Sequence, residues 1–424
     1  MMINLTEVKN RDIIQILIGC WIVITIIALN QIPYNYFAHD FDSHVEYTKI
    51  LVNENRIPKP NEGWETHQQP LYYLISSHLA PEKIKSDLPT HANYVRIFSA
   101  LCGAVTILLF VWLLQEITNN KFIQLLSIFF ISTTPKFVFV FTTYNNDSLA
   151  TMLSVAILVL SYKLYKSWNK RLGWALFVVS LAGLYTKLTI LVPMIIVFAI
   201  CLKELVLKKT PIRENQKKII QVLIFSLLFL LPWVLFHNYS TTGKLFPSLN
   251  FTSVPDGLKL ETPLIEIFSP TSLLENKPHK WDVPWVYPWP NDSSKRNDYL
   301  SYIFATSVIG EFVFKSPSIN FVWALLLVHL FIYLTALRYV LLSSKTKLAG
   351  IVILMAHVLH IVWVCKTPFS CNMDYRYIFW SCLGWVVLYA SVLSENIKNI
   401  SNILNKLMIA GIVLNILFIM NAVG

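Results

Sequence analysis

Long apolar runs constrain this chain more than any other feature. They recur from end to end, and a helix of about 20 apolar residues spans a hydrocarbon layer about 30 Å thick. The chain is 55% hydrophobic and 14% charged, whereas soluble domains carry about 25% charged residues. Since the alternating pattern of a membrane barrel is absent, the runs predict an all-α integral membrane protein.

We expect about eleven transmembrane helices in a single polytopic membrane domain, 1–424. Two long polar segments, 33–94 and 237–320, interrupt the apolar pattern. No small-residue cleavage site follows the first run, so it is expected to be retained as a span. The predicted spans are 13–32, 95–117, 122–141, 149–165, 172–185, 188–207, 219–236, 321–342, 348–365, 377–393 and 403–422.

Basic residues orient these spans. With a cytoplasmic N-terminus, eighteen Lys and Arg fall in or beside inner loops, and thirteen in or directly beside the long outer segments. Four fall in or beside short outer loops (Lys136, Lys187, Lys366 and Arg376), which completes the 35 of the chain. Because positive charge collects in cytoplasmic loops, the N-terminus is predicted inside and the C-terminus outside. This distribution also explains the net charge of +11 without a nucleic-acid partner. Dividing 172–207 into two short helices, which turn at Tyr185-Thr186-Lys187, keeps the following basic cluster inside.

The polar stretch after the first span carries two acids, Asp40 and Asp42, beside His39 and His44. Two carboxylates this close can bind a metal together or divide the roles of acid and base. The alternative is an ordinary Asp N-cap on an amphipathic surface helix, which the apolar spacing over 45–51 predicts. Capping explains one acid but not the pair with two histidines, so we favour a functional role.

A second motif, Gly63–Tyr73, reads GWETHQQPLYY and opens the next apolar helix. Its polar groups, among them His67, Gln69 and Tyr72, are suited to contact a sugar or a headgroup, and Pro70 suits a helix start. Anchoring of the aromatic residues at the membrane interface is the alternative.

Four further ionisable residues are predicted on the outer side. Lys187 lies in a short turn, where it could bind a phosphate or simply extend towards the interface. Asp147 opens a span, as an N-cap or as a substrate contact. Arg376 has the geometry for bidentate phosphate binding, although a structural pair with Asp374 is the alternative.

The second long segment contains the Trp-rich sequence Trp281–Pro290. Its Trp285 could belong to a stacking platform for a sugar or peptide, or to an aromatic belt at the interface. A surface helix is predicted over Tyr299–Phe314, in which Glu311 is either a substrate contact or a solvated acid. No Cys-x-x-Cys or His-x-x-x-His spacing indicates a zinc site.

Together these residues resemble the GT-C superfamily of membrane glycosyltransferases, which use polyprenyl-phosphate sugars. The most similar branch is that of the dolichyl-phosphate-mannose–protein mannosyltransferases (family 39-like). The resemblance covers most of the chain. Its specificity comes from the order of several short motifs along the chain and from their predicted position on the same side of the membrane. These motifs are Asp40-x-Asp42 with His44, Gln69–Tyr73, Asn146-Asp147, Leu184–Thr189 and Arg376-Tyr377.

The resemblance implies an inverting transfer from a polyprenyl-phosphate sugar to an acceptor hydroxyl at the outer face of the membrane. It implies that Asp40 or Asp42 is the general base; we favour Asp40, because the first acid of such pairs usually takes this role. Asp-Phe-Asp replaces the family's familiar Asp-Glu, so the assignment stays open between the two. Lys187, Arg376 and His67 would bind the donor phosphate. No metal or other cofactor is expected, because donors with one phosphate generally need none in this family.

The expected partners are the lipid donor and an acceptor protein, lipid or glycan. The expected location is a cell membrane, with the site facing the periplasm or cell exterior, or the endoplasmic reticulum lumen in a eukaryote. A bacterial membrane is favoured because the chain is compact. The residues expected to contact the substrates are His44, Gln69, Tyr72, Asp147, Trp285, Glu311 and Asp374.

Three other classes of protein were weighed. A polymerase or ligase of lipid-linked glycans shares the topology but usually has arginine-rich outer loops, whereas the short outer turns here hold only Arg376. A transporter or flippase would place ionisable groups near the membrane midplane, often in broken helices. A non-enzymatic assembly subunit would leave the paired acids unexplained.

Overall fold

The structure is a computed structural model, which describes residues 10–208, 211–247, 299–310, 312, 318–341, 343–366, 370–395 and 398–421. Every regular element in these ranges is helical, so the all-α prediction is confirmed for them. The chain divides into two compact units. Unit 1 comprises Met1–Phe37, Phe110–Thr142 and Val254–Gly424, and unit 2 comprises Ala38–Leu109 and Thr143–Ser253.

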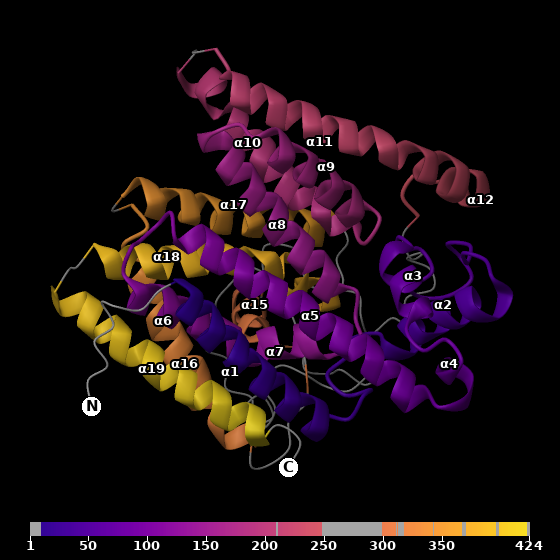
Figure 1. Ribbon diagram of the computed structural model, residues 1–424, viewed down its shortest axis with the longest axis horizontal. Helices are drawn as coiled ribbons and strands as arrows, with labels where there is room; N and C mark the ends of the chain where they lie inside the picture. Colours follow the sequence, from indigo (N-terminus) through magenta and orange to yellow (C-terminus); the bar gives the residue numbers. More distant parts are fainter. Residues whose placement is uncertain are drawn as a thin grey trace. The chain divides into compact units, whose positions relative to one another are not determined.

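Unit 2 combines a helical bundle with the helices of the first polar segment. In Figure 1, α8, α9, α10 and α11 lie side by side, and α2 lies beside α3. Its elements are α2 (Phe41–Glu54), α3 (Leu71–His78), α4 (Lys83–Ser86), most of α5 (Leu88–Leu114), α8 (Asp147–Lys166), α9 (Lys170–Leu184), η2 (Leu188–Ile190), α10 (Leu191–Lys208), α11 (Glu214–Pro232), η3 (Trp233–Tyr239) and α12 (Ser240–Thr242).

Unit 1 gathers helices from the beginning, middle and end of the chain. The pairs α16–α19, α17–α18 and α6–α18 are in contact, and α1 lies against α6 and α7. Its elements are α1 (Asn10–Gln31), α6 (Lys121–Ser132), α7 (Pro135–Thr142), α15 (Tyr299–Val308), α16 (Ser318–Leu337), α17 (Ser344–Lys366), η6 (Ser370–Met373), η7 (Tyr375–Ser381), α18 (Cys382–Ser394) and α19 (Lys398–Asn421).

Apolar helices long enough to cross a membrane agree with much of the predicted span pattern. Within the described ranges seven helices qualify, or eight if a bent pair is counted as one span. The seven are Asn10–Gln31, Leu88–Leu114, Asp147–Lys166, Glu214–Thr242, Ser344–Lys366, Tyr375–Ser394 and Ile400–Asn421. The predicted spans 172–185, 188–207 and 321–342 correspond to shorter helices, so the total of eleven remains a prediction.

The bent pair replaces the predicted span 122–141. α6 ends at Ser132, α7 begins at Pro135, and their axes differ by 67°. Proline has no backbone N–H to continue a helix, and its ring disfavours helical geometry at the preceding residue, so a break is expected at this point. The bend places the residues after Pro135 in a direction that a straight span would not give.

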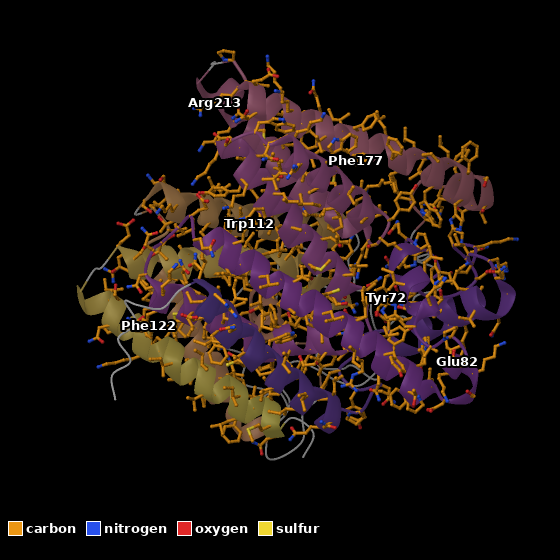
Figure 2. All side chains as sticks on the ribbon, in the orientation of Figure 1. Tyr72, Glu82, Trp112, Phe122, Phe177 and Arg213 are labelled. Atoms are coloured by element: carbon orange, nitrogen blue, oxygen red, sulfur yellow. The ribbon has the colours of Figure 1, made fainter. Side chains whose placement is uncertain are left out.

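The predicted turn between two short helices is present. α9 ends at Leu184, and the backbone N–H groups of Thr186 and Lys187 both donate to the Gly183 carbonyl, at 2.9 and 3.0 Å. A Cβ on Gly183 would lie 2.9 Å from the side chain of Ile190, so this close approach requires glycine. Figure 2 labels Phe177, whose ring packs against aromatic residues of α11 and fixes α9 to that helix.

Helices predicted in the two polar segments are also present. α2 covers the amphipathic stretch after Asp40, Pro70 directly precedes α3, and α15 covers the first ten residues of the predicted helix Tyr299–Phe314. Trp285 and Glu311 lie outside the described residues.

Candidate functional site

Asp40 occupies an unusual backbone position immediately before α2. Its φ of 55° and ψ of 30° are in the left-handed region, which costs an L-residue about 1–2 kcal/mol. Its side chain forms no cap hydrogen bond with the helix, so the N-cap interpretation does not account for this residue. Asp40 is half-buried, whereas Asp42, two residues on, is exposed. The two acids therefore have different surroundings.

His44, one turn into α2, is buried in a polar contact with α3. Its Nδ1 lies 2.9 Å from the Tyr73 hydroxyl, which donates a long hydrogen bond of 3.5 Å to the Glu65 carboxylate. The Tyr47 ring stacks on Tyr73 with centroids 3.8 Å apart. Burial lowers the pKa of His44, which Glu65 and then Asp40 partly oppose. The imidazole is therefore neutral near pH 7, and its Nδ1 shares a hydrogen bond with the Tyr73 hydroxyl.

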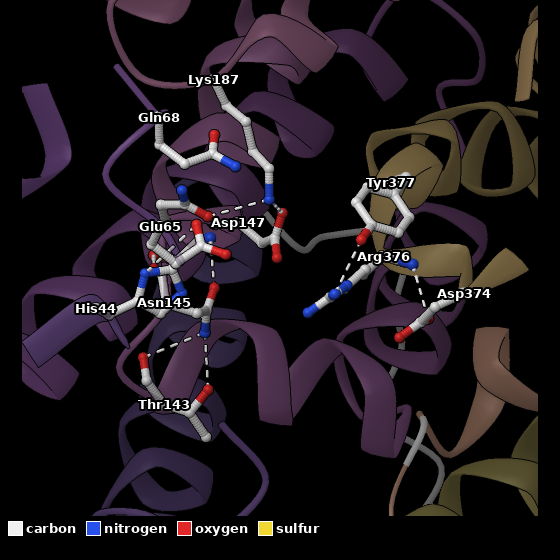
Figure 3. A network of polar contacts seen from close by, with 12 residues as sticks. His44, Glu65, Gln68, Thr143, Asn145, Asp147, Lys187, Asp374, Arg376 and Tyr377 are labelled. Atoms are coloured by element: carbon white, nitrogen blue, oxygen red, sulfur yellow. Dashed lines mark hydrogen bonds and ion pairs between the residues drawn. The ribbon is translucent and has the colours of Figure 1, made fainter. Parts of the chain in front are cut away.

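The Tyr73 hydroxyl connects this histidine to the start of α8. It accepts a hydrogen bond from Asn146 Nδ2 at 3.3 Å, and Asn146 Oδ1 accepts one from Lys187 Nζ at 3.1 Å. Lys187 Nζ also lies 2.6 Å from Asp147 Oδ1. The contacts form one path from His44 to Asp147, part of which appears in Figure 3.

Lys187 and Asp147 form a buried ion pair. Their side chains are 8% and 7% exposed, so the interpretation of Lys187 as a lysine extending towards the interface is wrong. The side chain of Asn145 caps the start of α8 by accepting from the Ser148 N–H at 3.0 Å. The Asp147 carboxylate is thus directed to Lys187 rather than to the helix end. Such a pair is costly to bury unless further hydrogen bonds support it, and Asn146 provides one.

His67 is held in a tight turn between Gly63 and Pro70. Its Nδ1 donates to the Trp64 carbonyl at 2.9 Å, and its Nε2 accepts from the Gln68 side chain at 3.2 Å. Burial lowers the pKa of His67, so it is also neutral near pH 7. Gln69 and Tyr72, from the same motif, are buried.

Charge links these residues into one group, which we call the unit 2 cluster: Asp40, His44, His67, Asp147 and Lys187. Asp40 raises, and Lys187 lowers, the pKa of both His44 and His67. Asp42 is not among the charges that shift the pKa of either histidine. Of the two predicted acids, Asp40 is therefore the one coupled to the cluster.

Unit 1 holds the second group of predicted residues around Asp374. This carboxylate is fully buried and lies 2.9 and 3.3 Å from Lys136 Nζ, which belongs to the first turn of α7. Its Oδ1 also accepts the backbone N–H of Arg376 at 2.9 Å, which caps η7. The expected role of Asp374 as a substrate contact does not fit a carboxylate enclosed in this way. The predicted structural pair with Arg376 is a backbone cap, and Lys136 is the cation.

Arg376 itself is partly exposed. Its Nη2 donates to the Tyr377 hydroxyl at 2.9 Å, and its guanidinium carbon lies 4.8 Å from the centre of the Tyr377 ring. Figure 3 shows this contact and the cap from Asp374. The Tyr377 ring in turn meets Trp363 of α17, with centroids 4.5 Å apart. The guanidinium is thus supported on one aromatic side chain.

Sequence reasoning did not identify Tyr73, Asn146 or Lys136 as parts of these groups. Tyr73 and Asn146 lie within the motifs Gly63–Tyr73 and Asn146-Asp147, but a motif does not show which of its residues contact one another. Lys136 was counted as a loop cation, although a lone lysine after proline and before an apolar helix was a usable signal.

Among the described residues no group of three or more His, Cys, Asp or Glu could hold a metal ion, and the expectation of no metal stays a prediction.

Comparison with known proteins bears on the fold. A family model described as a predicted membrane protein, DUF2142, matches residues 53–259. No curated protein matches the chain significantly.

Among solved structures, the oligosaccharyltransferase of Archaeoglobus fulgidus in its apo form matches with a TM-score of 0.55 at 13% identity, over 96% of this chain and 56% of that chain. The same archaeal enzyme, AglB, in complex with an inhibitory peptide and a dolichol-phosphate matches with a TM-score of 0.56 at 13% identity, over 95% and 55%. A third structure, tethered to an acceptor peptide, gives 0.56 at 12% identity, over 97% and 56%. The chain thus has a GT-C fold, as the resemblance of its sequence implied. It spans little more than half the length of the archaeal enzyme.

Proposed function

We propose that this protein is a glycosyltransferase that moves a sugar from a polyprenyl-phosphate donor to an acceptor hydroxyl at the outer membrane face. The observation that carries the proposal is the unit 2 cluster, in which the buried pair Lys187–Asp147 connects through Asn146 and Tyr73 to His44, on the helix that Asp40 directly precedes. A neutral hydroxyl needs a base to become a good nucleophile, and a departing phosphate needs a cation. The cluster contains both kinds of group.

The reaction is a single displacement at the anomeric carbon of the sugar. The acceptor oxygen forms a bond to this carbon while its proton passes to Asp40. The bond between the carbon and the phosphate oxygen breaks, and its electron pair leaves with the polyprenyl phosphate. Attack opposite the leaving group inverts the anomeric configuration. After the transfer Asp40 holds the proton. The cations stabilise the negative charge on the departing polyprenyl phosphate.

The surroundings of the two acids favour Asp40 over Asp42 as the base. Asp40 is half-buried and coupled to His44 and His67, whereas Asp42 is exposed on α2. The energy of the left-handed backbone also argues for a specific use of this side chain, since strain of this kind is concentrated at functional sites. We assign Asp42 to orienting the acceptor.

In unit 2, Lys187 is proposed to bind the donor phosphate, with His67 as a neutral hydrogen-bonding partner. In unit 1, the guanidinium of Arg376 is proposed separately as a cation for the donor phosphate. Asp147 neutralises Lys187 at 2.6 Å, so a bound phosphate must share or replace that carboxylate. His44, Gln69 and Tyr72 are assigned to the sugar or acceptor. No metal or other cofactor is included.

The relatives of known structure support a lipid phosphate as part of the donor. AglB has been captured in complex with an inhibitory peptide and a dolichol-phosphate, and tethered to an acceptor peptide. They also favour a second candidate, since AglB is an oligosaccharyltransferase. In that candidate this chain transfers a whole lipid-linked glycan rather than one sugar.

The test uses purified protein with donor, acceptor-containing envelope extract, and detection of released polyprenyl phosphate. Wild type and Asp42→Asn are expected to turn over, with Asp42→Asn slower. Asp40→Asn is expected to lose activity by about 10²–10⁴-fold, the usual contribution of general-base catalysis, while still binding donor. Full activity of Asp40→Asn would refute its assignment as the base. Release of lipid phosphate from a lipid-linked oligosaccharide, but not from a single-sugar donor, would select the second candidate.

A further inference from the structure

The ion pair between Lys136 and Asp374 has no part in the reaction as proposed. Both side chains are 1% exposed or less, and 238 residues of sequence separate them. Charges buried to this degree are costly, and replacement of a buried pair by neutral residues is often without penalty for stability. Stability alone therefore does not explain why two charges stand here.

The same carboxylate holds two groups at once. Asp374 Oδ1 lies 2.9 Å from Lys136 Nζ and accepts the Arg376 backbone N–H, also at 2.9 Å. The preceding N–H, of Tyr375, donates to Thr306 Oγ1 of α15 at 3.0 Å. Two successive peptide groups on the N-terminal side of the Arg376 side chain are thus fixed by side chains, and the guanidinium rests on Tyr377. This segment has little freedom to move independently of Asp374.

The bend at Pro135 supplies the last part of this arrangement. Lys136 is the second residue of α7, so the 67° change of direction governs where its ammonium group lies. The lysine contacts the carboxylate that caps η7, and it is 1% exposed. Its influence on Arg376 passes through Asp374.

We propose that Lys136 is a positioning residue for Arg376: through Asp374 it holds the Arg376 backbone so that the guanidinium is presented to the donor phosphate. This inference rests on the proposed function for the identity of the ligand. It assigns a role in donor binding to a lysine that is buried and does not contact the donor.

The experiment is a double-mutant cycle read out as KM for the donor and kcat. Arg376→Ala alone is expected to raise KM about tenfold, the size of one lost charged hydrogen bond. Lys136→Met is expected to raise KM by a similar factor, with kcat changed less. In the Arg376→Ala background, Lys136→Met should change KM less than about twofold, because the residue through which it acts is gone. Lys136→Arg should restore a KM near that of wild type.

A second pair of variants separates positioning from folding. Lys136→Met combined with Asp374→Asn removes both charges and keeps an amide oxygen that can cap η7, so it is expected to fold, with KM still raised. Lys121→Met, at the start of α6, is the control and should leave KM unchanged. If Lys136→Met raises KM equally with and without Arg376, or lowers only thermal stability, the positioning role is refuted. If wild type releases no lipid phosphate at all, the proposed function fails instead. The affinity for polyprenyl phosphate, measured without turnover, then still tests the coupling between Lys136 and Arg376.

Discussion

Two buried lysine–aspartate pairs, one in each unit, differ in their surroundings. Lys187–Asp147 in unit 2 is about 8% exposed and continues through Asn146 and Tyr73 to a histidine. Lys136–Asp374 in unit 1 is almost completely enclosed, and its carboxylate caps a backbone turn. The same two residue types thus form two different pairs. Lys187–Asp147 has polar neighbours that a ligand could rearrange, whereas Lys136–Asp374, the sealed pair, is enclosed by protein. The comparison predicts that Lys187–Asp147 affects ligand binding directly, whereas Lys136–Asp374 affects the fold first.

The largest expected effect on stability comes from the sealed pair. Lys136→Met leaves Asp374 buried without its cation, which should lower the free energy of unfolding by about 3–5 kcal/mol. Titration with a denaturing detergent, followed by tryptophan fluorescence, measures this. Combining Lys136→Met with Asp374→Asn should recover most of the loss. A loss no larger than that of Lys187→Met would remove the distinction between the pairs.

Lys187→Met should have the opposite balance. Its partner Asp147 has some access to water, so the loss of stability should be smaller than for Lys136→Met. Affinity for polyprenyl phosphate should fall by about tenfold, since a charged hydrogen bond to phosphate is lost. Binding of a fluorescent polyprenyl phosphate in detergent measures this, with Lys218→Met, a partly exposed lysine of α11, as the control. Unchanged affinity would contradict the phosphate-binding role.

The histidine joined to the Lys187 pair predicts a dependence of stability on pH. Burial lowers the pKa of His44 in the folded chain below its value of about 6.5 in the unfolded chain. The unfolded state therefore binds more protons between these two values, and stability falls as pH decreases below about 6.5. Thermal unfolding between pH 8 and 5 should show a weaker acid destabilisation in His44→Gln than in wild type. His78→Gln, which removes an exposed imidazole at the end of α3, is the control; an unaltered profile in His44→Gln would refute the prediction.

The smallest effect is expected from a third, exposed group of charges. Arg56 contacts Glu54 and Glu62 at 2.7 Å, and all three side chains are accessible. Such pairs contribute little because water screens them. Arg56→Ala should leave both the unfolding midpoint and the donor KM within experimental error. A clear loss of activity would indicate that the loop after α2 has a role that these contacts do not reveal.

The sequence predicted the local features of this molecule well. The positions of most long helices follow from apolar runs, the turn at Tyr185–Lys187 from the need to keep basic residues on one side, and the start of α3 from Pro70. The break at Pro135 was not predicted, because the apolar run 122–141 indicates one span, although a proline is a local signal for a break. Each of these features depends on residues that are neighbours in sequence.

The partners of charged residues were not predictable in the same way. Lys187 was predicted to bind a phosphate or to extend towards the interface, and Asp147 to be an N-cap or a substrate contact. Their pairing was not predicted, because it joins the start of a helix to a turn that is distant in the sequence. Lys136 was assigned to a loop, since nothing within α7 indicates Asp374. Burial of charge is a property of the packed unit, and periodicity along one helix does not determine which cation meets which acid.

The backbone at Asp40 has a consequence for how this chain would change under selection. Glycine adopts a left-handed conformation without the penalty that an aspartate bears. Laboratory evolution for heat resistance alone should therefore replace Asp40 with glycine early, whereas evolution that also requires the proposed transferase activity should retain the acid. The residue found at position 40 would then show whether the protein gives up stability at this position in order to keep its activity.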